Sequence, residues 1–130
     1  MIKYDNWNEL KKDISRKSVF WTIKPREIYW VRIGKNIGFE QDGKGDEFLR
    51  PVLVLKKFSK DVFVGLALTS QQKENHPLYF KFSYKKGKDS YAILSQIRLY
   101  DTKRIYSKSG KIGYDDFVLL KTKLKDVLEL

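Results

Sequence analysis

Short apolar runs separated by turn-sized polar stretches fill the middle of the chain. They lie at residues 27–33, 51–55, 62–68, 78–84 and 90–94. These runs are rich in β-branched and aromatic residues, which predicts five short strands. The run at 51–55 is continuously apolar, as is typical of a strand buried on both faces. The short gaps after it and around Gly87 predict two antiparallel hairpins, so the pattern favours a compact barrel or sandwich.

Helical periodicity marks both ends of the chain. Residues 5–17 place Trp7, Leu10 and Ile14 on one apolar stripe, and Asn6 can cap that helix. We therefore expect an N-terminal helical extension over residues 1–22, ahead of a single barrel domain over residues 23–130.

A second helix is predicted at about residues 115–129, with Asp115 as its cap. Its apolar stripe consists of Phe117, Leu120, Leu124 and Val127. The fold class expected from the pattern is therefore mainly β with flanking helices.

Length and composition narrow the classes of function. The 130 residues suit one domain, and 42% hydrophobic residues can fill its core. Cysteine is absent and His76 is the single histidine, which excludes thiolate zinc sites, cysteine nucleophiles and histidine pairs. We expect no metal and no cofactor. No run approaches the ~18 apolar residues of a membrane span, so we expect a cytoplasmic protein that does not bind membranes.

The formal net charge is +11, and most of it lies in one segment. Residues 81–111 carry nine Lys or Arg against two Asp, a net of +7. Such clustering favours a polyanionic partner, most often a nucleic acid. The alternative is a charge that serves only solubility, or one that the fold scatters over several faces.

Polar residues gather where two predicted strands begin and end. Arg50 stands at the start of the apolar run at 51–55, and Thr69 stands at the end of the run at 62–68. Since these runs would pair as a hairpin, antiparallel geometry makes Arg50 and Thr69 neighbours. The long polar loop before Arg50 carries Glu40 between glycines that allow close approach to a ligand.

A guanidinium, a hydroxyl and a carboxylate together suit cleavage of a phosphodiester by its own 2′-hydroxyl. Arg50 and Thr69 would stabilise the charge that develops on the phosphoryl oxygens. Glu40 would act as the general base, and RNA supplies the nucleophile itself. His76 is an alternative base, but it precedes a proline in a polar loop and is expected to be a solvated surface residue.

The order of four motifs resembles the PemK/MazF family of toxin ribonucleases. After a first strand at 28–33, the chain reads Gly38-Phe39-Glu40-Gln41, then Arg50-Pro51-Val52-Leu53-Val54-Leu55. A strand ending in Leu68-Thr69-Ser70 follows, and the last motif is Leu94-Ser95-Gln96-Ile97-Arg98-Leu99-Tyr100-Asp101-Thr102-Lys103-Arg104-Ile105.

This resemblance implies an SH3-like β-barrel, CcdB/PemK-like, with a C-terminal helix, acting as a homodimer. It implies metal-independent cleavage of single-stranded RNA by a toxin that an acidic antitoxin neutralises. Arg50, Thr69 and Glu40 take the catalytic roles. Residues expected to bind RNA are Gln41, Lys44, Ser70, Gln96 and Arg98. For Gln96 and Arg98, RNA contact and structural hydrogen bonding remain equally open.

Two departures from the family pattern stand out. Arg26-Glu27 replaces the usual Gly-Asp before the first strand, and the insert between Gln41 and Arg50 is longer than usual.

Two rival functions also remain. One is a non-catalytic binder on the same barrel, as in the CcdB toxins, since fold does not fix function. The other is a nucleic-acid-binding barrel that uses exposed aromatic residues for base stacking. Its candidate side chains are Tyr79, Phe80, Phe82, Tyr84 and Tyr91.

Overall fold

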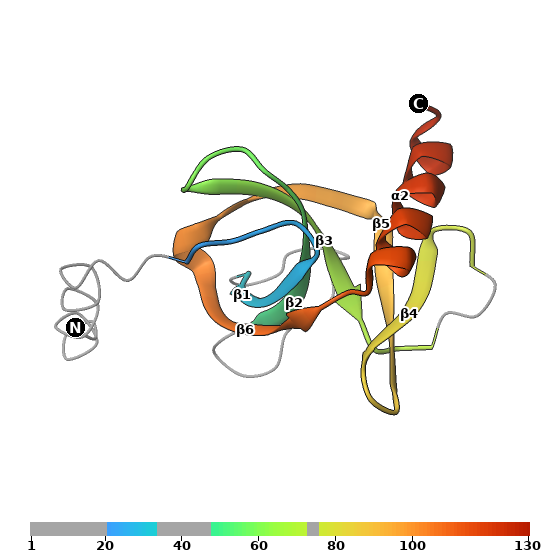
Figure 1. The fold of residues 1–130 in the computed structure, drawn as a ribbon, viewed down its shortest axis with the longest axis horizontal. Coiled ribbons are helices and arrows are strands. Elements are labelled where there is room, and N and C mark those ends of the chain that lie inside the picture. Colours follow the sequence, from blue (N-terminus) through green and yellow to red (C-terminus); the bar gives the residue numbers. More distant parts are fainter. Residues whose placement is uncertain (1–20, 34–47, 73–75) are drawn as a thin grey trace, which may run out of the picture.

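A computed structural model describes residues 21–33, 48–72 and 76–130. Its strands are β1 (Glu27–Arg32), β2 (Leu49–Lys57), β3 (Val62–Thr69), β4 (Tyr79–Lys85), β5 (Lys88–Asp101) and β6 (Ile105–Lys111). A 3₁₀ turn, η1 (Thr102–Arg104), joins β5 to β6, and the helix α2 (Tyr114–Leu128) ends the chain. The strands form one antiparallel sheet in the order β4-β5-β3-β2-β1-β6, shown in Figure 1.

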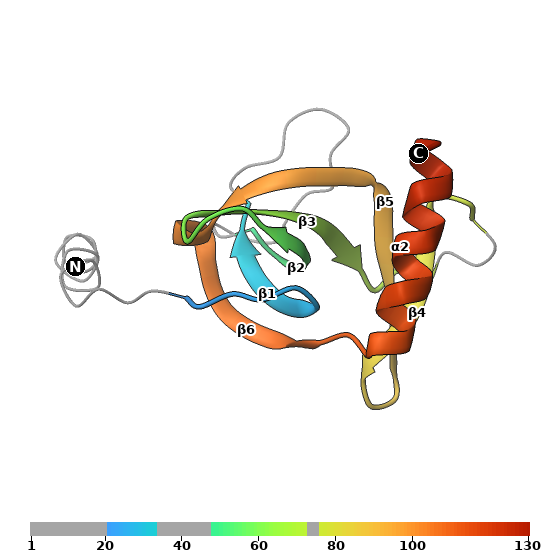
Figure 2. The same cartoon turned by 45° about the horizontal axis from the view of Figure 1, so that its top comes forward.

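The sheet curls until its two outer strands approach each other (Figure 2). The hydroxyls of Tyr84 on β4 and Ser109 on β6 hydrogen-bond at 2.8 Å. At Gly110 a Cβ atom would lie only 2.6 Å from the Tyr84 ring, so this approach requires glycine. These contacts close the barrel-like shape that the sequence predicts.

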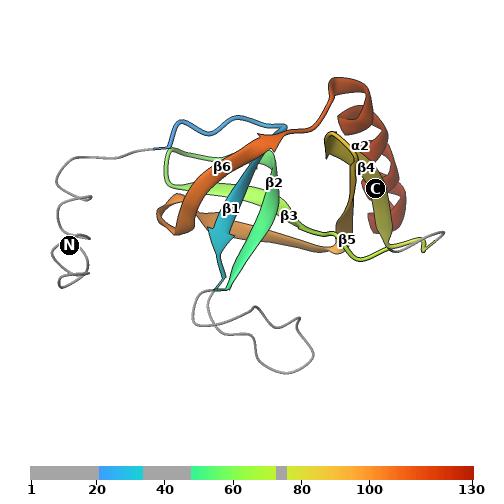
Figure 3. The same ribbon diagram turned by 90° about the horizontal axis from the view of Figure 1, so that it is seen from below.

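The two faces of the sheet bury two separate cores. The helix-side core is defined by Ile28, Leu53, Leu66, Leu68, Phe82, Ala92, Leu94, Ile112, Phe117, Leu120 and Leu124. The distal core, which contains no residue of α2, is defined by Ile23, Tyr29, Val31, Val52, Val54, Phe63, Tyr100 and Ile105. Neighbouring residues of β2 enter different cores, which confirms that this strand is buried on both faces. Figure 3 shows α2 beside β4 and β5, at one end of the curled sheet.

The C-terminal helix is confirmed, but its predicted cap is wrong. The helix begins at Tyr114 after an N-cap at Gly113, which makes no side-chain hydrogen bond. Asp115 instead lies in the first turn with Asp116, where carboxylates favour the positive end of the helix dipole. Phe117, Leu120 and Leu124 are buried, as the apolar stripe predicts.

The sequence pattern underestimates the sheet by one strand. β5 runs on to Asp101 instead of stopping at residue 94, and β6 is a sixth strand. Residues 95–99 of β5 are all exposed, so no buried alternation marks them. In the described sheet β6 is an outer strand that pairs with β1, and its Ser-Lys-Ser-Gly-Lys stretch carries almost no apolar signal.

The aromatic residues of the rival binding hypothesis belong mainly to the cores. Phe82 and Tyr91 are buried, and Phe80 and Tyr84 pack against the helix-side core. The buried rings of Phe82 and Tyr91 are therefore not free to stack on bases.

The predicted N-terminal helix and the long loop lie outside the described residues. Glu40, Gln41 and Lys44 fall in that loop.

Candidate active site

Arg50 is the second residue of β2. It lies next to the residues of this strand that enter the distal core. It stands opposite Val31 of β1, and its side chain shares a face with Val52 two residues on. The guanidinium is partly buried, and its Nη1 donates a hydrogen bond to the carbonyl oxygen of Leu68 at 3.1 Å. A guanidinium has five N–H donors in a fixed plane, so its direction matters as much as its charge.

Thr69 follows Leu68 and is the last residue of β3. The pair Val52↔Ala67 sets the register of β2 against β3, and continuing it puts Arg50 opposite Thr69. The hairpin thus confirms the prediction that Arg50 and Thr69 are neighbours. Thr69 is 8% exposed, and its Oγ1 accepts a hydrogen bond from the Gln71 amide at 3.2 Å. The hydroxyl can still donate its own proton to a ligand.

The electrostatic surroundings of Arg50 include two phenols. Burial lowers the pKa of Arg50, and the interactions with Tyr100 and Tyr79 partly offset this effect. The group nevertheless remains protonated near neutral pH, because an arginine pKa starts above ~12. Arg50 therefore suits the role of a fixed positive charge better than that of a base.

Tyr100, which the sequence reasoning missed, interacts electrostatically with Arg50. It is 5% exposed and stacks on Phe63, with ring centroids 5.4 Å apart. The guanidinium carbon of Arg98 lies 5.5 Å from the centre of the Tyr100 ring. Burial raises the pKa of Tyr100, and Arg98 and Arg50 oppose that rise. Its Oη is buried and has no hydrogen-bond partner among the described residues.

The remaining predicted RNA-binding residues that the structure describes are all exposed. Ser70 follows Thr69 at the end of β3, and Gln96 and Arg98 lie in the exposed stretch of β5. The contact of Arg98 with Tyr100 connects it to the surroundings of Arg50.

His76 is exposed, as expected, but it lies closer to this group than its loop position suggests. Its Nδ1 accepts a hydrogen bond from the Leu78 amide at 3.2 Å. Its ring meets Tyr79 edge-on, with centroids 4.7 Å apart. Since the Tyr79 phenol interacts with Arg50, His76 lies beside a neighbour of the site.

A second cluster of charged groups lies in the same core around Glu27. This carboxylate is 8% exposed and accepts three hydrogen bonds, from the Lys24 amide (2.9 Å), Tyr29 Oη (2.6 Å) and Lys108 Nζ (2.9 Å). Burial alone raises its pKa, but these donors and the charge of Lys108 outweigh it and hold the pKa below its ordinary value. The same burial and the carboxylate raise the pKa of Tyr29.

The basic residues of segment 81–111 are distributed over several elements. Its residues lie on the β4–β5 hairpin, in mid-β5, in η1 and on β6. Several of them already interact within the chain: Lys81 pairs with Asp89 at 3.8 Å, and Lys108 pairs with Glu27. Charge within the segment is therefore partly neutralised locally.

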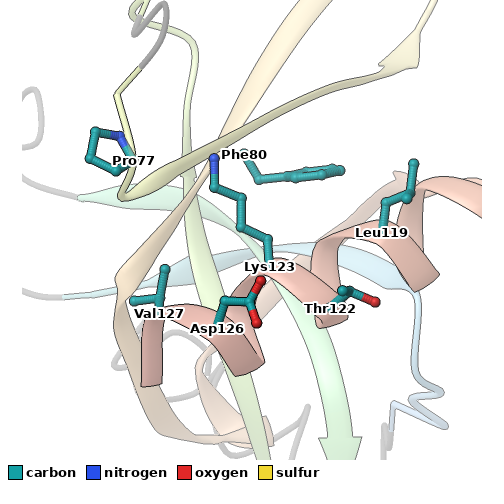
Figure 4. A pocket seen from close by; sticks show the side chains of 7 residues that line it. All are labelled: Pro77, Phe80, Leu119, Thr122, Lys123, Asp126 and Val127. Atoms are coloured by element: carbon teal, nitrogen blue, oxygen red, sulfur yellow. The ribbon is translucent and has the colours of Figure 1, made fainter. Parts of the chain in front are cut away.

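An open, mostly apolar groove of about 540 Å³ lies between α2 and β4 (Figure 4). It is lined by Pro77, Phe80, Leu119, Thr122, Lys123, Asp126 and Val127. Lys123 Nζ donates a hydrogen bond across it to the Tyr79 carbonyl at 3.2 Å. The groove contains none of the predicted site residues.

Residues 21–33, 48–72 and 76–130 hold no group of three or more His, Asp or Glu side chains placed to bind a metal ion. Within these same ranges, no helix is both long enough and apolar enough to cross a membrane.

A family model described as "PemK-like, MazF-like toxin of type II toxin-antitoxin system" matches residues 24–128. MazF from Deinococcus radiodurans has a similar structure, with a TM-score of 0.66, 18% identity, and 85% of this chain and 99% of that chain covered. Comparison with curated proteins gives no match.

Two mycobacterial structures are also similar. For the Mycobacterium tuberculosis toxin MazF-mt6 the TM-score is 0.62 at 12% identity, with 81% of this chain and 98% of that chain covered. For an endoribonuclease in complex with its cognate antitoxin, from a mycobacterial species, it is 0.62 at 13% identity, with 84% and 97% covered. At such identities these likenesses establish a common fold.

Proposed function

Because the chain belongs to the PemK-like, MazF-like toxins of type II toxin–antitoxin systems, we propose that it is an endoribonuclease that cleaves single-stranded RNA and thereby inhibits translation. The observation that carries the proposal is the pairing of Arg50 with the end of β3. Its guanidinium is anchored on the Leu68 carbonyl, and Thr69 comes next along the strand.

The proposed reaction is attack of the RNA 2′-hydroxyl on the adjacent phosphorus. The 2′-oxygen forms a bond to phosphorus and the bond to the 5′-oxygen breaks, which leaves a 2′,3′-cyclic phosphate and a 5′-hydroxyl. Arg50 and Thr69 donate hydrogen bonds to the phosphoryl oxygens as negative charge grows there. Glu40 takes the proton of the 2′-hydroxyl, and the leaving oxygen takes a proton from the site or from water. No metal or cofactor takes part.

Gln41, Lys44, Ser70, Gln96 and Arg98 are proposed to bind the RNA on either side of the cleaved bond. The exposure of Arg98, whose guanidinium packs over the Tyr100 ring, supports RNA contact for this residue.

The proposed partners are an acidic antitoxin and a second copy of the chain, in the cytoplasm. A net charge of +11 favours an acidic partner, and the related mycobacterial endoribonuclease binds its cognate antitoxin. A homodimer is supported by Ile97 and Leu99, apolar side chains that are 38% and 60% exposed on β5. In this stretch β5 pairs with β3 alone.

The test is cleavage of a labelled RNA by the purified protein in excess EDTA. Arg50→Ala is expected to lower kcat/KM by about 10²–10³-fold, as loss of a charge-stabilising donor does elsewhere. The matched control is Lys56→Ala, which removes the same charge from the same strand about 20 Å away. Lys56 is exposed, and its removal should change the rate less than twofold.

Three results would contradict the proposal: no cleavage by the wild type in any RNA pool, full cleavage by Arg50→Ala, or equal loss in both variants. The first would favour the non-catalytic binder. Fragments should carry the cyclic phosphate, which mass spectrometry identifies.

A further inference from the structure

Tyr106 is a large aromatic residue that the fold leaves exposed. Between β1 and β6 the register passes from the pair Trp30↔Ser107 to the pair Val31↔Ile105, so Tyr106 is an extra residue on β6. Such a bulge takes a residue out of the ladder and redirects its side chain. Tyr106 is 53% exposed, whereas Ile105 before it is buried in the distal core. Core packing therefore does not account for the ring of Tyr106.

Two arginines lie at the same end of β6 as Tyr106. The guanidinium carbon of Arg32 is 5.1 Å from the centre of the Tyr106 ring, which is a cation–π contact. Arg104 is exposed, and its Nη1 donates a hydrogen bond to the Arg32 carbonyl oxygen at 3.3 Å. Both positive groups therefore lie where the end of β1 meets the start of β6, next to an exposed aromatic ring.

A second cation–π contact lies on the same face of β1. Trp30 and Arg32 are two residues apart, about 6.6 Å along the strand, so their side chains point to the same face. Lys85 Nζ, at the end of β4, is 5.9 Å from the centre of the Trp30 ring. Lys85 is exposed and Trp30 is half-buried. These side chains form an aromatic–basic row, which consists of Lys85, Trp30, Arg32, Tyr106 and Arg104.

The aromatic–basic row lies on the opposite face of the sheet from Arg50. Arg50 pairs with Val31, whose side chain enters the distal core, and paired residues of neighbouring strands point to the same face. Trp30 and Arg32 flank Val31, so they point to the other face, as Ile28 of the helix-side core does. The row is therefore separate from the candidate active site.

Single-stranded nucleic acids bind to surfaces on which aromatic and positive side chains alternate. Their bases stack on aromatic rings and guanidinium planes, while Lys and Arg neutralise the phosphates. Residues 28–33 and 102–113, which include most of β1 and all of β6, contain no Asp or Glu that would repel a polyanion. An acidic peptide would use the positive groups, but it has no planar bases to stack on Tyr106 and Trp30.

We propose that the aromatic–basic row is a second RNA-binding site, which holds an unpaired stretch of the substrate away from the bond that is cleaved. Bases stack on its two aromatic rings, and its three positive groups neutralise the phosphates. The inference rests on the proposed function, because it assigns the row to the RNA that is cleaved at Arg50. RNAs long enough to reach both sites should therefore bind more tightly than RNAs that fill the active site alone.

The primary test measures binding of a fluorescent RNA about 20 nucleotides long, which exceeds the roughly 4–16 nucleotides that one small barrel covers. Its 2′-oxygens are methylated, so the probe cannot be cleaved by attack of its own 2′-hydroxyls. Tyr106→Ala should raise the Kd about fivefold or more, as loss of one stacked base does elsewhere. Tyr106→Phe restores the ring and should return the Kd to within about twofold of the wild type.

Tyr114→Ala is the matched control. Tyr114 is 64% exposed, and the guanidinium carbon of Arg26 is 5.6 Å from the centre of its ring, so it repeats the arginine–tyrosine contact at the other end of β1. Tyr114 begins α2, and the carboxylates of Asp115 and Asp116 follow it, where they repel phosphate. The Kd of this variant should stay within about twofold of the wild type.

The positive groups have a readout of their own, the dependence of the Kd on salt. Lys85→Gln should reduce the slope of log Kd against log salt concentration by about 0.7, the value for one phosphate contact of a single strand. Lys56→Gln, which removes an exposed charge from β2, should leave the slope unchanged.

Failure of the proposed function and failure of this inference give different results. If the wild type cleaves no RNA but Tyr106→Ala still weakens binding of the probe, the proposed function fails and the row is supported as an RNA-binding site. If the wild type cleaves RNA but Tyr106→Ala changes neither the Kd of the probe nor the KM of long substrates, the row is not an RNA-binding site.

Three further results overturn the inference. Equal losses in Tyr106→Ala and Tyr114→Ala mean that removal of any exposed ring has this effect. A changed molar mass of Tyr106→Ala in light scattering identifies the row as a contact between copies of the chain. Unchanged binding of the RNA probe together with weaker binding of polyglutamate identifies an acidic protein as the partner of the row.

Discussion

Two tyrosines of the distal core differ in what their hydroxyls meet. Tyr29 and Tyr100 are both almost fully buried, and burial raises the pKa of each. The Tyr29 hydroxyl donates to Glu27, a carboxylate that is satisfied by three donors. The Tyr100 hydroxyl has no partner among the described residues, and the Arg98 guanidinium packs over its ring. The comparison separates a buried hydroxyl that stabilises the fold from one that gains no hydrogen bond on folding.

The largest change in stability should come from the hydrogen-bonded cluster around Glu27. Glu27→Ala leaves the Tyr29 hydroxyl and the Lys24 amide without their acceptor, so the free energy of unfolding should fall by about 3 kcal/mol. Cleavage per folded molecule should not change. Urea denaturation measures the effect, and Asp126→Ala, which removes an exposed carboxylate of α2, should stay within about 0.5 kcal/mol of the wild type. A loss of cleavage in folded Glu27→Ala would link the two clusters and undo their separation.

At Thr69 we expect a large loss of activity and only a small change in stability. Thr69→Val keeps the β-branched shape but removes the hydroxyl, so kcat should fall about a hundredfold. The free energy of unfolding should change by about 1 kcal/mol or less, because the hydroxyl accepts only the amide of exposed Gln71. An unchanged kcat would mean that Thr69 takes no part in catalysis. Arg50 would then be the one proposed catalytic residue within the described ranges.

The sequence alone is sufficient to predict that Arg50 and Thr69 lie together. The short gap between the apolar runs at 51–55 and 62–68 predicts a hairpin, and hairpin geometry alone brings Arg50 to Thr69. The apolar stripe of the C-terminal helix is equally readable. Both signals are local, because the partners lie close in sequence.

The unsatisfied hydroxyl could not be predicted, because it depends on what is absent around Tyr100 after folding. Its stacking partner Phe63 comes from a strand far away in the sequence. Arg26 illustrates the same limit. It stands where the family usually has glycine, and its φ of 80° is the left-handed conformation that glycine prefers. Nothing in the sequence of this chain alone marks Arg26 for that conformation.

Acid should weaken the hydrogen-bonded cluster around Glu27. The folded pKa of Glu27 lies below its unfolded value, so its contribution to stability is complete above the unfolded pKa, near pH 4.3. It is lost as the pH falls further, through the folded pKa. Glu27→Gln should therefore show a shallower decline in the free energy of unfolding below about pH 4.3 than the wild type. Equal declines in the two proteins would mean that Glu27 titrates alike in both states.

The smallest change in stability should follow loss of the ion pair between Lys108 and Glu27. Lys108 is 47% exposed, and Lys108→Met leaves Glu27 with two donors, so the free energy of unfolding should fall by less than about 1 kcal/mol. The difference should shrink at 1 M salt, where exposed charges are screened. If Lys108→Met costs as much as Glu27→Ala, the ion pair rather than the Tyr29 hydroxyl stabilises this carboxylate. The contrast with Tyr100 would then rest on charge and not on whether a buried hydroxyl has a partner.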